Sequence, residues 1–235
     1  MRAVSRLHIP DCGTCPTRET AELCHLDSTA AEEFAKIKRT VMYQPGQFVF
    51  YEGHTVLGLY ILCTGRAKLT RSTIRGQQRV VGIVDPGQLI EKHSFQEAAM
   101  HEVTCEALEP SQVCMIDRVR YLDILEQNGD LAVRVIKLLS REMGQSLGEA
   151  DQLAFSSARE RIAGLLLELA DRYGESVEDG SRISLHLKRE ELAQMAALTV
   201  ETAVRILQTF QRENLIRIDG RELTILQPDR LSRAT

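Results

Sequence analysis

The sequence lacks a long hydrophobic run, and no stretch approaches the ~18 consecutive apolar residues of a membrane-spanning helix. It does not open with a basic stretch followed by an apolar one, the pattern of a secretory leader. It also lacks a glycine-rich phosphate-binding loop and any Ser or Cys grouping with His and Asp that would indicate an activated nucleophile. We therefore expect a cytoplasmic protein with no membrane partner that is not an enzyme.

The chain has little net charge, −4 at pH 7 over 235 residues. This balance argues against indiscriminate binding to polyanions. From Arg182 onwards the sign is reversed, with nine Lys or Arg against seven Asp or Glu. This small excess of positive charge suggests that the C-terminal part is attracted to one groove of a nucleic acid rather than to polyanions in general. The length exceeds that of an average domain and suggests two domains.

Residues 40–117 have the pattern of an antiparallel β-domain. Short apolar or β-branched runs are separated by turn residues such as Pro45–Gly46, Gly65 and Pro86–Gly87. The predicted strands are residues 48–51, 57–64, 66–72, 79–84, 103–107 and 112–116. Strands spaced about eight to twelve residues apart predict a small antiparallel barrel or roll.

A helical pattern begins at Asp130, where apolar residues recur at spacings of three and four over roughly 25 residues. At ~1.5 Å per residue this predicts a helix near ~40 Å long. A long amphipathic helix between two domains suggests a coiled-coil dimer seam, and packing against its own β-domain is the alternative. Ser156–Ser157 interrupts the pattern. Residues 158–174 then predict a second helix, followed by a polar loop at 175–181.

Residues 188–207 have the pattern of two short helices joined by a tight turn. Thr199 is a favourable N-cap for the second helix, because its hydroxyl can accept from an exposed backbone N–H. Glu201, Thr202 and Arg205 are expected to face outward. The inward-facing residues are expected to be Val200, Ala203, Ile206, Leu207 and Phe210. A braced helix with polar and basic residues at its start has the helix-turn-helix geometry that enters the major groove; the alternative is an ordinary antiparallel helix pair.

Two β-rich runs follow this helix pair. They flank Asp219–Gly220, a dipeptide that type I′ hairpin turns favour because both central positions need a positive φ. A helix-turn-helix followed by a hairpin is a winged helix. The sequence therefore predicts binding to double-stranded DNA.

The six cysteines are unevenly distributed, and in a cytosolic protein they indicate metal, redox or buried residues before disulfides. Cys12, Cys15 and Cys24 crowd the N-terminal segment, where they can approach one metal. Tetrahedral zinc or an iron–sulfur cluster usually takes four ligands, so the fourth must come from elsewhere in the fold. Cys63 and Cys105, in predicted strands, are expected to be buried packing residues.

The order of β-roll, long helix and winged helix resembles the CRP/FNR family of bacterial transcription regulators over nearly the whole chain. The resemblance implies an α+β fold with a roll like a cyclic-nucleotide-binding domain. The expected domains are an N-terminal cysteine segment (1–27), a β-roll sensor (28–117), connecting and dimerisation helices (118–157) and a winged helix-turn-helix (158–235). It also implies a homodimer on a palindromic promoter site, with RNA polymerase as a partner.

The stretch TVETAVR, Thr199–Arg205, resembles the recognition motif of this family. The resemblance implies that Glu201 accepts from a cytosine amino group and that Arg205 donates to guanine N7 and O6. Thr199 and Thr202 belong to the same DNA-binding set. Val204 stands where FNR has Ser, and its side chain can contact a thymine methyl.

The stretch CEALEPSQVCMID, residues 105–117, resembles FNR around the fourth cysteine ligand of its oxygen-labile [4Fe–4S] cluster. The resemblance implies the ligand set Cys12, Cys15, Cys24 and Cys114. It also implies that Leu23 shields the cluster from oxygen and that nitric oxide can attack the same iron. The loop between the second and third cysteines is longer than in the best-known FNR.

Other sensing chemistries have weaker support in the sequence. The stretch from Gly87 lacks the ribose- and phosphate-binding residues of cyclic-nucleotide members, since Lys92 replaces the ribose Glu and Glu91 adds a negative charge where phosphate would approach. Cyclic AMP is therefore not expected. His93 matches the haem ligand of the carbon-monoxide-sensing branch, which makes haem one alternative. A thiol switch without a cofactor, or a zinc site on the same cysteines, is the other.

Overall fold

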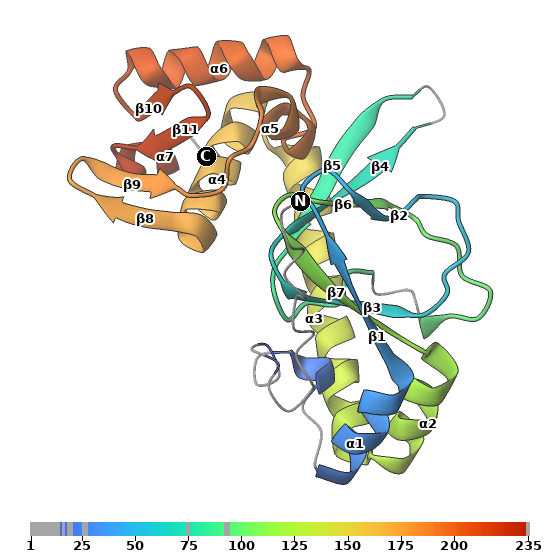
Figure 1. The fold of residues 1–235 in the computed structure, drawn as a ribbon. Helices are drawn as coiled ribbons and strands as arrows, with labels where there is room; N and C mark the ends of the chain where they lie inside the picture. Colours follow the sequence, from blue (N-terminus) through green and yellow to red (C-terminus); the bar gives the residue numbers. More distant parts are fainter. Residues whose placement is uncertain are drawn as a thin grey trace, which may run out of the picture. The chain divides into compact units, whose positions relative to one another are not determined.

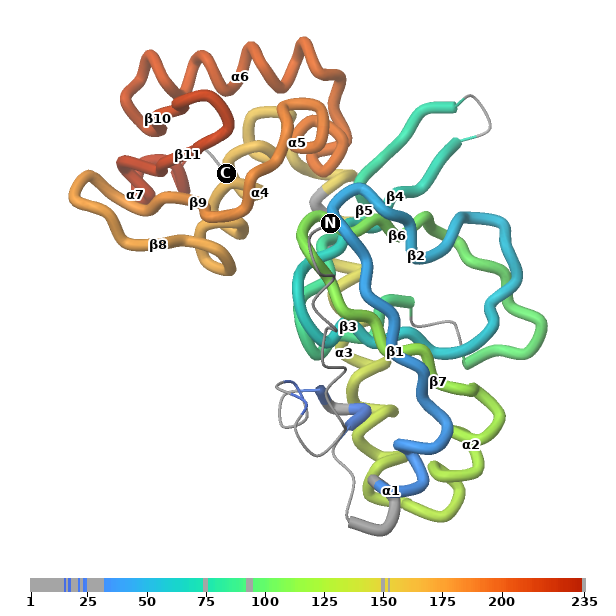
Figure 2. Tube along the Cα trace, viewed as in Figure 1, coloured from blue at the N-terminus to red at the C-terminus, as the bar shows by residue number. Residues whose placement is uncertain are grey.

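The computed structural model describes residues 15, 17, 21–24, 28–73, 76–91 and 95–233 (Figure 1). They form two compact units, the first ending at Met143 and the second beginning at Gly144 and including residues 77–81. The path of each unit can be followed in Figure 2. In the described part of the chain, none of the helices combines the length and the apolar character needed to cross a membrane.

The first unit, together with the strand residues 78–81 that precede Gly82, contains two antiparallel sheets, which confirms the predicted roll. One sheet has the order β1 (Lys38–Tyr43), β7 (Ser111–Ile116), β3 (Leu59–Thr64). The other has the order β2 (Phe48–Phe50), β6 (Thr104–Ala107), β4 (Ala67–Ser72), β5 (Gln78–Val84). Each predicted strand is present with small differences at its ends, and β1 begins before the predicted β-region.

The alternation of side chains along β3 and β7 divides the interior of the first unit into two hydrophobic cores. The first core is made of Leu23, Phe34, Leu59, Ile61, Cys63, Leu89, Cys114, Ile116, Tyr121, Ile124, Leu131 and Val135. The second core is made of Phe50, Tyr60, Leu62, Ala67, Val84, Ile90, Cys105 and Val113. Successive residues of β3 therefore serve different cores, and nearly the whole strand is buried.

Helices close the first core at one end of the roll (Figure 1). They are the short 3₁₀ turn η2 (Glu22–Cys24), α1 (Ser28–Ile37), α2 (Arg118–Gln127) and the beginning of α3 (Gly129–Phe155). Asp117 caps α2 by accepting from the backbone N–H of Arg120 at 3.0 Å. The uninterrupted α3 confirms the predicted long helix. Its residues Leu131 and Val135 lie in the first core, so the helix packs on its own β-domain at this end.

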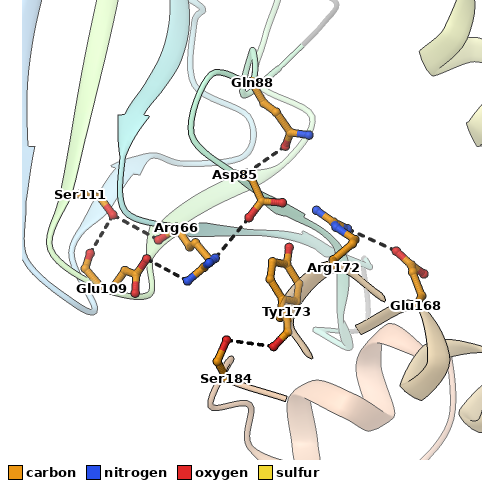
Figure 3. Close-up of polar contacts among 9 residues, drawn as sticks. All are labelled: Arg66, Asp85, Gln88, Glu109, Ser111, Glu168, Arg172, Tyr173 and Ser184. Carbon is orange, nitrogen blue, oxygen red and sulfur yellow. Dashed lines mark hydrogen bonds and ion pairs between the residues drawn. The ribbon is translucent and has the colours of Figure 1, made fainter. Parts of the chain in front are cut away.

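The second unit is a winged helix-turn-helix, as predicted. It contains α4 (Ala158–Tyr173), β8 (Gly174–Val177), β9 (Gly180–Ile183), α5 (Arg189–Met195), α6 (Val200–Arg212), β10 (Ile216–Asp219), β11 (Glu222–Ile225) and α7 (Pro228–Ser232). Ser157 and Glu160 form a capping box at the start of α4. At the end of α4, the Ser184 hydroxyl donates to the Tyr173 carbonyl at 3.0 Å (Figure 3).

Two local predictions about this unit were wrong. Residues 175–181 are not a loop but belong largely to the β8–β9 hairpin, which extends the wing sheet in the order β10-β11-β9-β8. Its strands are polar because β8 is an exposed edge strand. The wing turn is centred on Gly220–Arg221 rather than Asp219–Gly220, because Asp219 still pairs with Glu222 in the ladder.

The turn between β3 and β4 is held close to the first residue of β7. Gly65 has a φ of +78° there. Arg66 forms ion pairs with Asp85 at 3.3 Å and Glu109 at 3.4 Å (Figure 3). The Ser111 hydroxyl lies 3.2 Å from the Arg66 carbonyl oxygen and 2.7 Å from that of Glu109. This network joins the strands that carry Cys63 and Cys114.

We expect Gly65→Ala to destabilise the first unit more than Gly46→Ala does. Both glycines have a positive φ, which costs a residue with a Cβ about 1–2 kcal/mol. A Cβ at position 65 would also lie 2.5 Å from the Pro110 carbonyl oxygen, whereas one at position 46 would meet nothing within 4 Å. Urea unfolding of both variants measures the difference. Equal losses in free energy of unfolding would show that the close approach is unimportant.

Candidate functional sites

Cys114 lies on β7, the central strand of its sheet, and its side chain is buried in the first core. Its register partners are Thr40 on β1 and Ile61 on β3. The pKa of Cys114 is lowered, chiefly by a hydrogen bond from Cys63 and further by the charge of Lys38 and a hydrogen bond from Thr40, while burial opposes the shift. These neighbours favour the thiolate, which is the form that binds metals.

Cys63 lies on β3, the strand that pairs with β7, and enters the same core as Cys114. The hydrogen bond with Cys114 is the largest cause of a raised pKa at Cys63, followed by burial and by the negative charge of Cys114, Cys15 and Cys24. The Cys63 thiol donates to the carbonyl oxygen of Ile61 at 3.8 Å. The prediction that Cys63 is a buried packing residue is confirmed, since it belongs to the first core.

The N-terminal cysteines that the structure describes approach the same core. Cys15 and Cys24 are half-buried and pack against the first core, which contains Cys63 and Cys114. The Cys24 N–H donates to the Ala21 carbonyl at 2.8 Å within the η2 turn. The structure thus brings three of the four predicted metal ligands to one core. Cys12, the fourth, lies outside the described residues.

Leu23 is buried in the first core, and its carbonyl oxygen accepts from the hydroxyl of the buried Tyr121 at 3.1 Å. This hydrogen bond ties the cysteine segment to α2, the helix that carries Tyr121. Burial raises the pKa of Tyr121, with the nearby Cys24 adding to the shift, so the phenol remains a neutral donor. Leu23 therefore contributes both packing and a fixed backbone position next to Cys24.

The donor atoms of this set are of the kind that a metal or iron–sulfur group takes. Sulfur ligands at the edge of an apolar core are the surroundings that iron–sulfur clusters and structural zinc use. Among the residues with described positions, no three His, Cys, Asp or Glu side chains are close enough together to form a metal site. Cys15, Cys24 and Cys114 are the described residues that would hold such a group, with Cys12 as the fourth ligand of the predicted set.

The second candidate site is the exposed face of α6. Thr199 caps this helix by accepting from the Thr202 N–H at 3.3 Å, as predicted. Glu201 and Arg205 are exposed, and Thr202 and Val204 are partly exposed on the same helix. The buried side chains of α6 are those of Ala203, Leu207 and Phe210.

The expectation that Val200 faces inward was wrong, because its side chain is 40% exposed. Val200 directly follows the N-cap and is the first residue of α6, so it precedes the buried stripe of the helix. Ala197, in the turn before α6, has a φ of +52°. The same turn is held by Arg161 of α4, whose Nε donates to the Ala196 carbonyl at 3.0 Å. The turn is thereby fixed against the body of the domain.

The wing is joined to the first helix of the pair. Arg189, at the start of α5, donates to the Gly220 carbonyl in the wing turn at 3.0 Å. Burial lowers the pKa of Arg189, although a guanidinium remains charged at neutral pH. Wing and helix pair therefore form one surface of fixed geometry, which suits docking to a rigid duplex.

Comparison with known proteins gives the family. Residues 40–128 match the cyclic nucleotide-binding domain and residues 160–234 match the Crp-like helix-turn-helix domain. The transcriptional activator protein Anr of Pseudomonas protegens is 28% identical over 231 residues, covering 98% of this chain and 93% of that protein. The chain belongs to the CRP/FNR family of transcription regulators. It is a DNA-binding regulator and not an enzyme.

Other relatives of this CRP/FNR regulator have names that refer to different ligands. The cyclic AMP receptor protein of Thermus thermophilus is 27% identical over 191 residues, covering 79% of this chain and 85% of that protein. The structure of the c-di-GMP-responsive global regulator CLP of Xanthomonas campestris has a TM-score of 0.74 at 22% identity, covering 85% of this chain and 99% of that chain. The latter likeness confirms the fold alone. The signal must therefore be inferred from the sites of this chain.

The roll interior of this CRP/FNR regulator contains a buried pair that the sequence did not indicate. His101 Nδ1 contacts the Glu91 carboxylate, whose other oxygen accepts from the Glu102 N–H at 2.8 Å. The His101 ring stacks on Phe50 with centroids 3.8 Å apart. The Glu91 carboxylate is thus bound within the roll. His93, the candidate haem ligand, and Lys92 lie outside the described residues.

Proposed function

We propose that this CRP/FNR regulator is a cytoplasmic homodimer that binds a palindromic promoter site and responds to oxygen, and to nitric oxide, through a [4Fe–4S] cluster. Its ligands would be Cys12, Cys15, Cys24 and Cys114. The observation that carries the proposal is the approach of Cys15 and Cys24 to the core that contains Cys114. When bound, the cluster would supply oxygen-labile iron.

The first core connects the cysteines to other elements of the chain through packing contacts. Leu23, Cys114 and the α3 residues Leu131 and Val135 belong to this one core. A group that holds the cysteine segment in place also holds the packing against α3. If the DNA-competent form binds that group more tightly, occupancy shifts the population toward it by the difference in affinity. Loss of the group releases the segment and weakens the support of α3.

The proposed dimer would form through the other face of α3. Apolar side chains lie exposed there at helical spacings: Ile136 at 62%, Met143 at 66% and Leu147 at 64%. A long helix that buries one side in its own core and exposes a second apolar stripe is suited to pairing with a copy of itself. Two copies would present two recognition helices to the two halves of a palindrome.

At each half-site, Glu201 and Arg205 would read a G·C pair. They are exposed and one helical turn apart on α6, so both can reach base edges in one stretch of major groove. Thr199, Thr202 and Val204 complete the proposed DNA-binding set. RNA polymerase would be the partner of the DNA-bound dimer.

The sensing proposal predicts a broad visible absorption in protein purified without oxygen, with iron and sulfide bound, that bleaches in air. Cys114→Ser should abolish the band, because one of four thiolate ligands is lost. Cys105→Ala is the matched control, since Cys105 is equally buried but lies in the second core. Absorption spectra and metal analysis make the measurement.

Other absorption spectra or metal contents would support a different cofactor. A sharp Soret band would identify haem and favour His93. Bound zinc, or free thiols with no metal, would favour a zinc or thiol switch, which the presence of Cys63 and Cys114 in one core makes the stronger alternative. If the protein binds DNA with equal affinity with and without a bound cluster, cluster occupancy and DNA binding are not linked as proposed.

The DNA proposal predicts that Arg205→Ala weakens binding to the cognate site about 10–100-fold, because one bidentate base contact is worth ~1–3 kcal/mol. Arg212→Ala is the control, because Arg212 lies at the end of α6 and donates to Thr209 within the helix. Binding is measured by fluorescence anisotropy at fixed salt with specific and scrambled duplexes. If Arg205→Ala weakens binding equally to both duplexes, Arg205 contacts a phosphate rather than a base.

The dimer proposal predicts that Leu147→Glu converts the dimer to a monomer, because a buried carboxylate would face its own copy across the seam. Gln145→Glu adds the same charge to another exposed face of α3 and should leave the dimer intact. Sedimentation velocity of both variants makes the test. A dimer that survives Leu147→Glu would place the interface elsewhere.

A further inference from the structure

Arg221 is an exposed cation in the wing turn between β10 and β11. Asp219 and Glu222 still pair in the ladder, so Gly220 and Arg221 form a two-residue turn. Gly220 has a φ of +62° there. Among the residues whose positions are described, none forms an ion pair or a hydrogen bond with the Arg221 side chain. Its guanidinium is therefore available to a partner outside the chain.

The other two arginines of the wing sheet each have an acidic partner nearby. Arg217 of β10 lies 2.7 Å from Asp179 and 3.6 Å from Asp219. Arg182 of β9 lies 2.7 Å from Glu175. The acid next to the wing turn is thus balanced by an arginine of the sheet. The unpaired positive charge of this region lies in the turn itself.

The wing turn is held against α5. Nη2 of Arg189, the first residue of α5, donates to the Gly220 carbonyl at 3.0 Å, directly before Arg221 in the chain. In a helix-turn-helix, the first helix crosses the phosphate backbone while the second enters the major groove. A turn that is fixed to the start of α5 therefore lies next to the same backbone. Guanidinium groups suit such a place, because their forked N–H donors match the oxygens of a phosphate.

We propose that Arg221 binds a DNA phosphate beside each half-site, and that Arg189 is a positioning residue which acts through the wing turn. Arg189 uses its guanidinium on the Gly220 carbonyl and does not itself contact DNA. A turn that is already held in place loses less conformational entropy on binding than a free one. The inference rests on the proposed binding of a dimer to a palindrome, and it extends that proposal from the base-reading helix to the wing.

The test compares the salt dependence of DNA binding for the full chain and its Arg221→Ala, Arg189→Ala and double variants. The probe is a duplex that the wild-type protein selects from a random-sequence library, and binding is measured by fluorescence anisotropy. Each phosphate contact contributes about 0.9 to the slope of log K against log salt, so Arg221→Ala should make the slope of a dimer less steep by about 1.8. Arg189→Ala should produce a similar change. The double variant should show no further change, because Arg189 acts only through Arg221.

Two further measurements separate the positioning role from a general effect of charge or folding. Arg182→Ala removes the same charge from the same sheet and should keep the wild-type slope. Without DNA, hydrogen exchange in the wing turn should be faster in Arg189→Ala than in the wild type, because the contact with Gly220 already exists in the free protein. If Arg189→Ala does not fold by circular dichroism, Arg189→Met keeps the aliphatic stem without the donors and takes its place.

Several results would overturn the inference. A wild-type slope in Arg221→Ala would exclude the phosphate contact. Additive changes in the double variant would exclude the positioning role, because Arg189 would then bind a phosphate itself. Changes of half the expected size in Arg221→Ala, Arg189→Ala and the double variant would support the inference and overturn the proposed dimer, since one wing would then contact each site. A wild-type protein that selects no sequence would overturn the proposed promoter binding, and this inference with it.

Discussion

The antiparallel pairing of β3 with β7 is the constraint on which the first core and its cysteines depend. Ile61 lies opposite Cys114 in this register. Cys63 lies at the register shift between Leu62 and Thr64, and it belongs to the same core as Cys114. A slip of one residue would move Cys114 to the second core. The shared core of the two cysteines thus depends on this pairing, which the network around Arg66 and Ser111 helps to hold.

The first core also determines which elements the cysteine segment contacts. Leu23 and the beginning of α3 share this core, and Tyr121 hydrogen-bonds the backbone of Leu23. Ordering the segment therefore stabilises contacts made by two helices rather than a local loop. Packed interiors transmit such changes because they have few voids in which displacements can be absorbed. The exposed apolar stripe of α3 lies on the same helix, so support at its beginning can bear on pairing through that stripe.

In the winged helix-turn-helix unit, local hydrogen bonds fix the start of each helix and the turns between elements. Ser157, Lys188 and Thr199 precede α4, α5 and α6, and each makes or supports an N-terminal cap. Arg161 and Arg189 then bind carbonyl oxygens in the two turns that must be rigid. The result is a recognition helix whose first turns are exposed on a fixed frame.

The sequence by itself determined most element types, the order of β-roll, long helix and winged helix, and the N-terminal cysteine pattern. All of these depend on neighbouring residues: hydrophobic periods, caps such as Thr199 and turn dipeptides. Only the tertiary structure decided that Cys63 and Cys114 share one core, that His101 pairs with Glu91, and that residues 175–181 contribute strands to the wing sheet. These facts depend on which distant strands pair and in which register. A local pattern does not contain that information, because one alternating or polar run is compatible with several partners.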